Sequence, residues 1–457
     1  MTILDLIKHQ VEQNKTEIAV YADGQKITYQ ELWQKSHECS EDLSGHDEGT
    51  KIGIAIKHPI QFIKWYVGAL INHQIPCVID ASRDDNHILD VLTINHIPIY
   101  IDNSEQITEV EKVEVQSLPH DTLHIGFTSG TTGMPKAYLR SHMSWMKSFQ
   151  YNDAFMNESI KVYAAPGPHA HSLSLYVMIY ALCRGKSFYG QSSFNAQKLV
   201  RELNHLGQKK TLFVVPTMIY SILNERENLK CLSSMYSSGA KLPQAMFEKL
   251  KTIYPHVDII EFFGSSEASF ISYNLNGKAP LDTVGYLFPS VKIKLENKGV
   301  DQIGKLYISS DMIFSGYLNS DNDYSWIEVG DWASINEQQE LRLYGRDSER
   351  LIIGGKNIYP EVIEQAVLSI DEVFEAIVIG EAHHQFGEIA VLIYRGNIEI
   401  KYRDLRKLLL SKGVSRYEIP SKIKQVRKMK YTESGKISRY KMKHAYQNGG
   451  KEWKLLL

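Results

Sequence analysis

A segment rich in glycine and hydroxyl side chains is the part of the sequence best suited to bind phosphate. Residues 127–136 read FTSGTTGMPK and continue the short apolar run LHIGF. Gly130 and Gly133 allow the backbone to approach an anion closely, and Lys136 supplies a positive charge. Four hydroxyl side chains can donate hydrogen bonds to phosphate oxygens: Thr128, Ser129, Thr131 and Thr132. The spacing is not that of a Walker A loop, so an exposed loop without a ligand is the alternative at this point.

Charged or imidazole side chains stand beside glycine or hydroxyl residues at several later points. The segments are PGPHAHSL at 166–173, SSGAKL at 237–242, EFFGSSE at 261–267, VGDW at 329–332, GRDSERLIIGGKNIYPEVIE at 345–364 and TESGKISR at 432–439. Each of them alone has an ordinary structural explanation, such as a surface histidine, a strand followed by a turn, or a basic tail. Their order along one chain carries more information than any of them singly.

Together these segments resemble the motifs of the adenylate-forming superfamily, which includes acyl- and aryl-CoA synthetases, luciferases and peptide-synthetase adenylation domains. Residues 127–136 match the family's phosphate-loop pattern, Tyr/Phe-x-Ser-Gly-Ser/Thr-Thr-Gly-x-Pro-Lys, at each specified position. Residues 345–364 resemble GRxxDxIxxGGxNIxPxEIE, and residues 432–439 resemble TxSGKIxR. The resemblance extends from about Asp23 to Arg439, which is nearly the whole chain.

The resemblance implies an ATP site assembled from several of these segments. Residues 128–133 and Lys136 would hold the phosphates. Asp331 and Arg346 would hold the ribose, because a carboxylate accepts hydrogen bonds from both ribose hydroxyls. Glu267 would bind Mg²⁺, a hard cation that prefers oxygen ligands. The remaining nucleotide contacts implied are Gly239, Ala240, Phe262, Phe263, Gly264, Ser265 and, at the phosphate, Ser266.

The resemblance also implies two catalytic residues, a hinge and a loop that faces the thiol. Lys436 would stabilise the charge that develops on the carboxylate and the α-phosphate as pyrophosphate leaves. His169 falls at the position of a family side chain beside the acyl pocket, and its neighbour His171 is the weaker candidate. Ser348 would lie at the hinge between two domains. The loop that turns toward pantetheine would consist of Gly354, Gly355 and Lys356.

The chain departs from the family pattern at two positions of the predicted nucleotide site. Phe263 stands where the family usually has Tyr, and Val329 stands where it usually has Thr, so two polar contacts are lost. A nucleotide-binding pseudoenzyme or regulator is therefore an alternative. The retention of Lys136, Glu267 and Lys436 argues against it.

The reaction that the resemblance implies is ATP-dependent activation of a carboxylic acid to its acyl-AMP, followed by transfer of the acyl group to a thiol. CoA is the favoured acceptor, and an acyl carrier protein is the alternative. No acidic residue lies between Pro166 and Cys183 to pair with a substrate ammonium, so an amino acid is disfavoured. The apolar run SLSLYVMIYAL, with Val215 to Thr217 and Phe262, favours a fatty or aryl acid, with a fatty acid slightly ahead.

The pattern of short β-branched runs and helices predicts an α/β fold in which these motifs follow strands. Runs at 51–56, 76–79, 97–101, 161–165, 211–215 and 258–263 alternate with helical patterns, which indicates βαβ units and largely parallel sheets. From Val284, short strands with turns predict a small antiparallel subdomain. A strand, helix, strand, strand, helix pattern after Arg350 predicts a small, mobile α+β domain. We place the domains at 1–347 and 348–457, joined by a hinge.

Composition limits the class of protein. A chain of 457 residues is too long for one ordinary core, and a formal net charge of −2 provides no global basic field for nucleic acid. The four cysteines lack CxxC spacing, which favours a reducing, cytoplasmic compartment over a disulfide framework or a zinc site. The amphipathic start MTILDLIKHQVEQNK predicts a surface helix rather than a signal peptide.

Association with other molecules is constrained less by the sequence. No apolar stretch is long enough to span a bilayer, so membrane contact is expected to be peripheral at most. The basic residues between Lys422 and Lys443 are expected to form a solvated face rather than a patch for CoA phosphate or lipid. A homodimer is left open.

Overall fold

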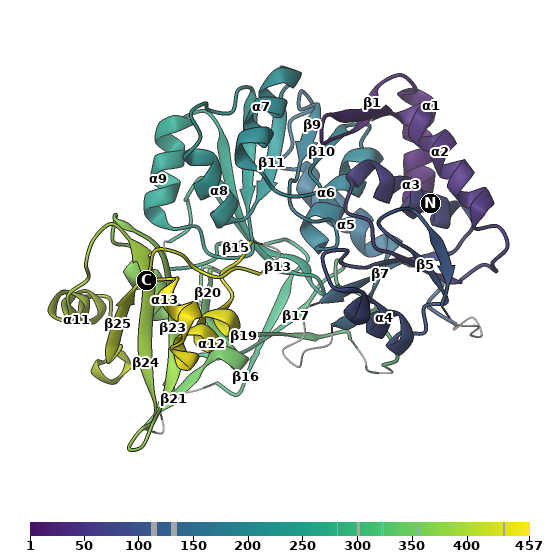
Figure 1. Cartoon of the computed structure of the whole chain (residues 1–457). Coiled ribbons are helices and arrows are strands. Elements are labelled where there is room, and N and C mark those ends of the chain that lie inside the picture. The colour runs from purple at the N-terminus through teal and green to yellow at the C-terminus, as the bar shows by residue number, and fades with distance from the viewer. Residues whose placement is uncertain are drawn as a thin grey trace.

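The computed structural model describes residues 1–110, 117–128, 135–280, 282–298, 302–320, 322, 324–354, 356–432 and 435–457. Within these ranges the chain forms two large sheets surrounded by helices, a small antiparallel sheet, and a further sheet with its own helices at the C-terminus (Figure 1). This arrangement confirms the predicted fold class, a large α/β part with an antiparallel subdomain followed by a small α+β part.

The first large sheet has nine strands in the described ranges. They are β1 (Ile18–Ala22), β2 (Gln25–Thr28), β9 (Val162–Ala164), β10 (Ser187–Gly190), β11 (Lys210–Val214), β12 (Leu232–Ser237), β13 (Asp258–Ser265), β14 (Ser269–Leu275) and β15 (Tyr286–Leu287), in the order β15-β14-β13-β12-β11-β9-β10-β1-β2. The central strands run parallel, as the alternating pattern predicts. Every residue of β9 and β11 is buried, as is typical of the central strands of a parallel sheet, and in β11 this includes the polar Lys210 and Thr211.

The second large sheet carries the predicted phosphate loop. Its strands are β3 (Lys51–Ile54), β4 (Ile75–Val78), β5 (Ile99–Ile101), β6 (Ile107–Glu109), β7 (Thr122–Thr128), β8 (Lys136–Ser141) and β18 (Gly316–Tyr317), in the order β18-β8-β7-β4-β3-β5-β6. β7 and β8 pair antiparallel up to Thr128 and Lys136. The predicted phosphate loop therefore joins two paired strands, which fixes where it begins and ends.

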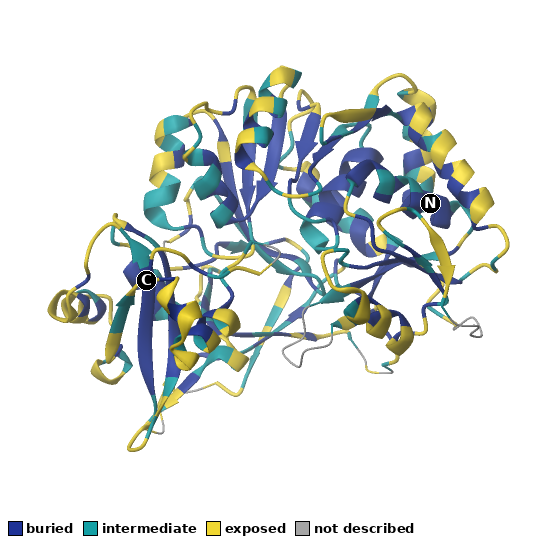
Figure 2. Cartoon of the chain, viewed as in Figure 1, coloured by how far each residue is buried: buried dark blue, intermediate teal, exposed yellow. Residues whose placement is uncertain are grey.

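Helices cover both large sheets. They are α1 (Ile3–Gln13), α2 (Tyr29–Asp42), α3 (Pro59–Ile71), α4 (Asp85–Ile94), α5 (His142–Asp153), α6 (Ser172–Cys183), α7 (Ala196–Leu206), α8 (Pro216–Leu223) and α9 (Gln244–Ile253). α3 contacts β1 of one sheet and β3 and β4 of the other, and both α3 and α6 are buried on nearly all sides. Figure 2 shows the contrast with the outer helices, whose solvent faces are exposed. Apolar residues all round a helix indicate such a central position.

The small sheet leads into the C-terminal part of the chain. β16 (Lys292–Glu296), β17 (Gly304–Ser309), β19 (Ile327–Ile335) and β20 (Leu341–Arg346) form an antiparallel sheet, followed by a 3-10 turn at Asp347–Glu349. The elements after it are β21 (Leu351–Ile353), β22 (Lys356–Ile358), α10 (Pro360–Leu368), β23 (Val373–His383), β24 (Gly387–Gly396), α11 (Tyr402–Ser411), a 3-10 turn at Arg416–Glu418, β25 (Lys422–Gln425), α12 (Arg439–Asn448) and α13 (Lys451–Lys454).

The C-terminal part has hydrophobic clusters of its own. Their buried residues begin at Leu351, whereas those of the larger part end at Leu343. The domain boundary between 347 and 348 falls inside this interval and stays a prediction. The expected basic tail is a folded element instead, because Met442 and Trp453 are buried in the second C-terminal cluster. None of the described helices is both long and apolar enough to cross a bilayer.

Candidate active site

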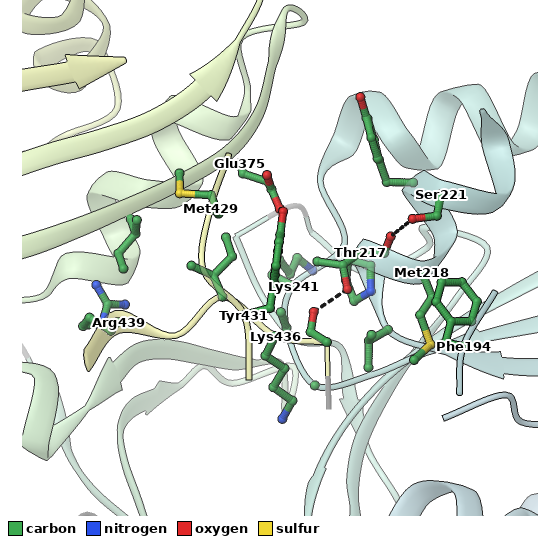
Figure 3. Close-up of a pocket in the computed structure, with 18 of the residues that line it drawn as sticks. Phe194, Thr217, Met218, Ser221, Lys241, Glu375, Met429, Tyr431, Lys436 and Arg439 are labelled. Carbon is green, nitrogen blue, oxygen red and sulfur yellow. Dashed lines mark hydrogen bonds between the residues drawn. The ribbon is translucent and has the colours of Figure 1, made fainter. Parts of the chain in front are cut away.

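A cavity of about 1170 Å³ opens between the larger part of the chain and the C-terminal part. Figure 3 shows its walls, with Thr217 and Met218 on α8 opposite Tyr431 and Lys436 of the C-terminal part. A second cavity of about 1710 Å³ shares several of its lining residues, Lys436 among them, and extends toward the ends of β7 and β8. Most of the predicted site residues line one or both cavities.

Lys436 reaches the predicted nucleotide site from the C-terminal part. A Cβ atom added to Gly239 would lie 2.6 Å from Lys436 Cε and 3.2 Å from its Nζ. Gly239 also has a φ of +86°, so glycine is favoured there by both conformation and space. Desolvation in the cleft lowers the pKa of the Lys436 ammonium, Arg346 lowers it further, and Asp331 opposes both. Segments nearly 200 residues apart in the chain therefore meet at one point.

Asp331 and Arg346 form a pair on neighbouring strands of the small sheet. Arg346 Nε lies 3.2 Å from Asp331 Oδ1, and Arg346 Nη1 donates to the Val329 carbonyl at 3.0 Å. The other carboxylate oxygen of Asp331, Oδ2, is buried without a hydrogen-bond partner in the described residues. Burial raises the pKa of Asp331, and Arg346 opposes that shift. A buried acceptor without a donor beside a cavity is suited to a ligand hydroxyl.

The turn between β13 and β14 presents Ser266 and Glu267 to the second cavity. Tyr317 donates a hydrogen bond to Glu267 Oε1 at 3.0 Å, and the ring of Tyr317 lies 5.3 Å from Lys136 Nζ. Ser266 Oγ donates to Ser172 Oγ at 3.0 Å. Glu267, Ser266, Thr128 and Lys136 all line the same cavity.

A magnesium ion is compatible with this group of residues. Glu267 offers carboxylate oxygens, the Tyr317 hydroxyl contacts one of them, and the Ser266 hydroxyl lies on the preceding residue. No group of three or more His, Cys, Asp or Glu residues suited to a metal occurs in the part of the chain that the structure describes. A single carboxylate is typical of Mg²⁺ that is bound largely through substrate phosphates and water.

The predicted phosphate loop is described only at its two ends. Thr128 and Lys136 face each other across the β7–β8 pair, and Thr128 Oγ1 donates to the Lys136 carbonyl at 3.5 Å. The intervening residues of the prediction lie outside the described ranges: Ser129, Gly130, Thr131, Thr132 and Gly133. The cradle that they would form therefore stays a prediction.

The predicted adenine-binding segments meet along one wall. Gly239, Ala240, Phe262, Phe263 and Gly264 line the first cavity, and Ser265 lines the second. Sequence reasoning did not single out the ion pair beneath them. Lys241 Nζ lies 3.1 Å from Glu261 Oε2, and the Leu242 amide donates to Glu261 Oε1 at 2.8 Å. The lysine in the SSGAKL segment was a weak signal, since the pair joins the loop after β12 to a residue inside β13.

The two histidines of the segment 166–173 have different environments. His169 is 5% exposed, stacks on Phe62 with ring centroids 4.1 Å apart, and its Nε2 lies 2.5 Å from the Ile56 carbonyl oxygen. Burial lowers the pKa of His169 to about 4. His171 Nε2 is buried without a partner in the described residues and lines the second cavity with Lys436. His171 is thus at least as well placed as His169, which sequence reasoning had favoured.

The predicted hinge borders a cavity that Lys436 also lines, whereas the described residues of the predicted thiol loop line neither cavity. Ser348 is in the 3-10 turn after β20 and borders the second cavity. Lys356 is exposed, and its ammonium lies 4.0 Å from the centre of the Tyr417 ring. Neither Gly354 nor Lys356 lines either cavity, and Gly355 lies outside the described residues. The structure therefore brings Lys436, but not the predicted thiol loop, to the site.

A small set of side chains holds the C-terminal part against α8. Thr217 Oγ1 donates to the Gly435 carbonyl at 2.5 Å. Arg395 of β24 donates to the Tyr220 hydroxyl at 3.4 Å, and its guanidinium lies 4.7 Å from the Tyr220 ring centre. Phe374 contacts the same ring, with centroids 5.6 Å apart. No local sequence pattern marks these residues, because their function is set by the packing of two distant segments.

Comparisons with known proteins agree with this geometry. The profile of the family described as AMP-binding enzyme matches residues 72–318. A putative long chain fatty acid-CoA ligase of Staphylococcus epidermidis is 40% identical over 98% of this chain and 99% of its own length. An uncharacterized acyl-CoA ligase of Bacillus subtilis is 28% identical, with 97% of this chain and 98% of the relative covered.

Solved structures show the same fold. The O-succinylbenzoate CoA synthetase of Bacillus subtilis, in complex with ATP and magnesium ion, has a TM-score of 0.80 at 19% identity over 96% of this chain and 99% of that one. ATP-bound MatB from Rhodopseudomonas palustris has a TM-score of 0.82 at 18% identity over 98% and 99% of the two chains. At this identity the likeness concerns the fold alone.

Proposed function

This chain belongs to the AMP-binding enzyme family and is an acid–thiol ligase, and we propose that it converts a fatty or aryl acid to its CoA thioester. The observation that carries the proposal is the meeting of Lys436 with Gly239, Asp331 and Arg346 at one cavity. Lys436 of the C-terminal part lies near Asp331, a carboxylate of the larger part that could bind ribose hydroxyls. This arrangement is suited to a nucleotide-dependent reaction.

In the first proposed half-reaction, an oxygen of the substrate carboxylate forms a bond to the α-phosphorus of ATP. The bond from that phosphorus to the bridging oxygen breaks, and pyrophosphate leaves with the electron pair. Lys436 would stabilise the charge that develops on the transferred group, and Lys136 the charge on the phosphates. Asp331 and Arg346 would orient the ribose, which holds the reacting atoms in line.

Glu267 would hold the magnesium ion that accompanies ATP. When bound there, Mg²⁺ would offset the negative charge of the triphosphate and of the departing pyrophosphate. The oxygen-rich surroundings of Glu267, with the Tyr317 hydroxyl at 3.0 Å, support this assignment. Ser266 lies next in the chain and would contact the same phosphates.

In the second proposed half-reaction, the thiol sulfur forms a bond to the acyl carbon, the bond from that carbon to the AMP oxygen breaks, and the thiol proton passes to solvent. A rotation about Ser348 would withdraw Lys436 and present Gly354 to Lys356. The larger part and the C-terminal part have separate hydrophobic clusters, which supports such a motion because neither core would be divided by it.

The acid is proposed to be fatty or aryl because the inner walls of the site are apolar. The second cavity is lined in part by Leu173, Phe213, Val215, Met218 and Phe270. The relatives named as fatty acid and acyl-CoA ligases support the same class. Pyrophosphate release measured over a panel of alkyl, aryl and amino acids, with and without CoA, tests this class, and amino acids are expected to give none.

The lysine assignment is tested by separating the two half-reactions. The change Lys436→Ala is expected to lower acid-dependent exchange of pyrophosphate into ATP by about 10²- to 10³-fold. Thioester formation from supplied acyl-AMP and CoA is expected to stay largely intact. The exposed tail residue Lys454 provides the control, and Lys454→Ala is expected to behave as wild type in both assays. Equal losses in the two assays would contradict the proposed function of Lys436.

A further inference from the structure

The buried guanidinium of Arg140 lies directly beneath the turn that carries Glu267. Arg140 belongs to β8, is 2% exposed, and heads the fully buried side chains by volume. Its Nη1 donates to the Met312 carbonyl at 2.7 Å and to Ser144 Oγ at 3.4 Å, and its Nη2 donates to the Ser266 carbonyl. Arg140 also lines the same cavity as Glu267.

Such a residue is costly to bury. All three acceptors of Arg140 in the described residues are uncharged oxygens, so none of these hydrogen bonds neutralises its charge. Burial lowers the pKa of Arg140 to about 10, with Tyr138 and Glu267 opposing the shift, and the side chain therefore stays protonated at neutral pH. Packing alone does not explain why a charged side chain is buried here, close to the carboxylate of Glu267.

Arg140 joins three segments that come from distant parts of the sequence. β8 starts at Lys136, the end of the predicted phosphate loop, and the Ser266 carbonyl belongs to the turn after β13. Met312 lies shortly before β18 in the chain. Phe314, which lies between Met312 and β18, donates its amide to the Glu267 carbonyl at 2.7 Å. The Tyr317 hydroxyl of β18 then reaches the Glu267 carboxylate. The turn is thus fixed from below by Arg140 and from one side by β18.

We propose that Arg140 is a positioning residue that presets the Ser266–Glu267 turn for magnesium and the ATP phosphates. Its guanidinium, a rigid planar group, holds the Ser266 and Met312 carbonyls at once, and its charge balances Glu267 when no metal is bound. Lysine provides the charge without the planar group, and methionine provides neither. The inference rests on the proposed function, because it takes Glu267 as the carboxylate that holds the metal.

The test compares two buried cations that both bind carbonyl oxygens. Lys210 is 0% exposed and donates to the Lys230 carbonyl at 2.7 Å, but it lines neither cavity. Both Arg140→Met and Lys210→Met are expected to lower the thermal unfolding midpoint. Only Arg140→Met is expected to weaken binding of Mn²⁺ in the presence of α,β-methylene-ATP, by about 10- to 100-fold, as is typical when a residue that orients a metal ligand is removed. Electron paramagnetic resonance of free Mn²⁺ measures that binding without turnover.

Arg140→Lys keeps the charge and is expected to weaken Mn²⁺ binding in the same direction by a smaller factor. A folded Arg140→Met protein with wild-type Mn²⁺ affinity would overturn the inference, and so would wild-type affinity in Arg140→Lys if Arg140→Met does not fold. Failure of the proposed function has a different signature, since the unaltered protein would then show no acid-dependent pyrophosphate exchange with Mg²⁺ and ATP. An altered Mn²⁺ affinity in Lys210→Met would also count against a specific function of Arg140.

Discussion

The two regions that bring charge to the site are attached in opposite ways. Glu267 sits on a turn held by a buried arginine, by β18 and by two paired strands of a large sheet. Lys436 belongs to the C-terminal part, where the Thr432 amide donates to the Lys436 carbonyl at 2.7 Å. The C-terminal part contacts the larger part through Thr217 and Tyr220 on α8, and Tyr359 also contacts the rings of Trp332 and Tyr344. In the proposed mechanism, the turn that carries Glu267 stays in place, whereas Lys436 moves between the two half-reactions.

This difference is consistent with the functions proposed for Glu267 and Lys436. A carboxylate that holds a metal gains from preorganisation, because reorienting it during the reaction would cost free energy. A lysine needed in only one of two half-reactions gains from a small interface, since every contact in that interface must be broken between them. The Tyr431 hydroxyl donates to Glu375 at 2.7 Å, which ties the segment before Lys436 to the rest of the C-terminal part.

The largest expected effect comes from breaking the fixed side. The change Glu267→Gln keeps the shape of the side chain and removes its charge, and pyrophosphate exchange is expected to fall by about 10²- to 10³-fold. The loss should be partly recovered at high Mg²⁺ concentration, because weakened metal binding is its cause. The control is Glu248→Gln on α9, which lines neither cavity. A loss that is independent of Mg²⁺ would indicate that Glu267 does not hold the metal.

A smaller effect is expected from loosening the movable side. Tyr220→Ala removes the ring that lies 4.7 Å from the Arg395 guanidinium. A cation–π contact of this kind is worth about 0.5–2 kcal/mol, so the population in which Lys436 lies at the site, and with it the rate of pyrophosphate exchange, should fall about 2- to 30-fold. Thioester formation from supplied acyl-AMP should be unchanged or faster. Tyr440→Ala, on the exposed face of α12, serves as the control. A parallel fall in the rates of both half-reactions would contradict the proposal that Tyr220 holds the C-terminal part in place for the first half-reaction only.

The smallest expected effect concerns Glu361 of the C-terminal part, whose raised pKa makes the stability of the protein depend on pH. Burial, Glu364 and Asp331 raise the pKa of Glu361 from 4.5 to about 7, and Arg439 opposes them. Because the folded state binds this proton more tightly than the unfolded state, the associated stability is present at low pH and is lost as the pH rises through about 7. The unfolding midpoint of the wild type should therefore fall by about 2–4 °C more between pH 5 and pH 8 than that of Glu361→Gln. Equal pH dependence in both proteins would show that Glu361 does not titrate in this range.

The sequence by itself determined the elements and the chemistry that each motif offers. Parallel β-branched runs, the strand before the phosphate loop and the helix of residues 360–369 were all predictable, because side-chain periodicity and turn residues act over a few positions. The family was likewise readable from the order of the motifs. The packing of Met442 and Trp453 was missed, since they are sparse apolar residues among lysines, and so was the ion pair between Lys241 and Glu261.

The tertiary structure alone decided which of these groups share a cavity. That Lys436 lies against Gly239, that Arg140 contacts the Glu267 turn, and that His171 Nε2 is buried without a partner in the described residues all depend on packing between distant segments. The same holds for Tyr220, an ordinary helix residue until Arg395 is placed on it. Local sequence patterns encode backbone conformation over a few residues, whereas the distance between two such segments is set by the shared core and by the orientation of the domains.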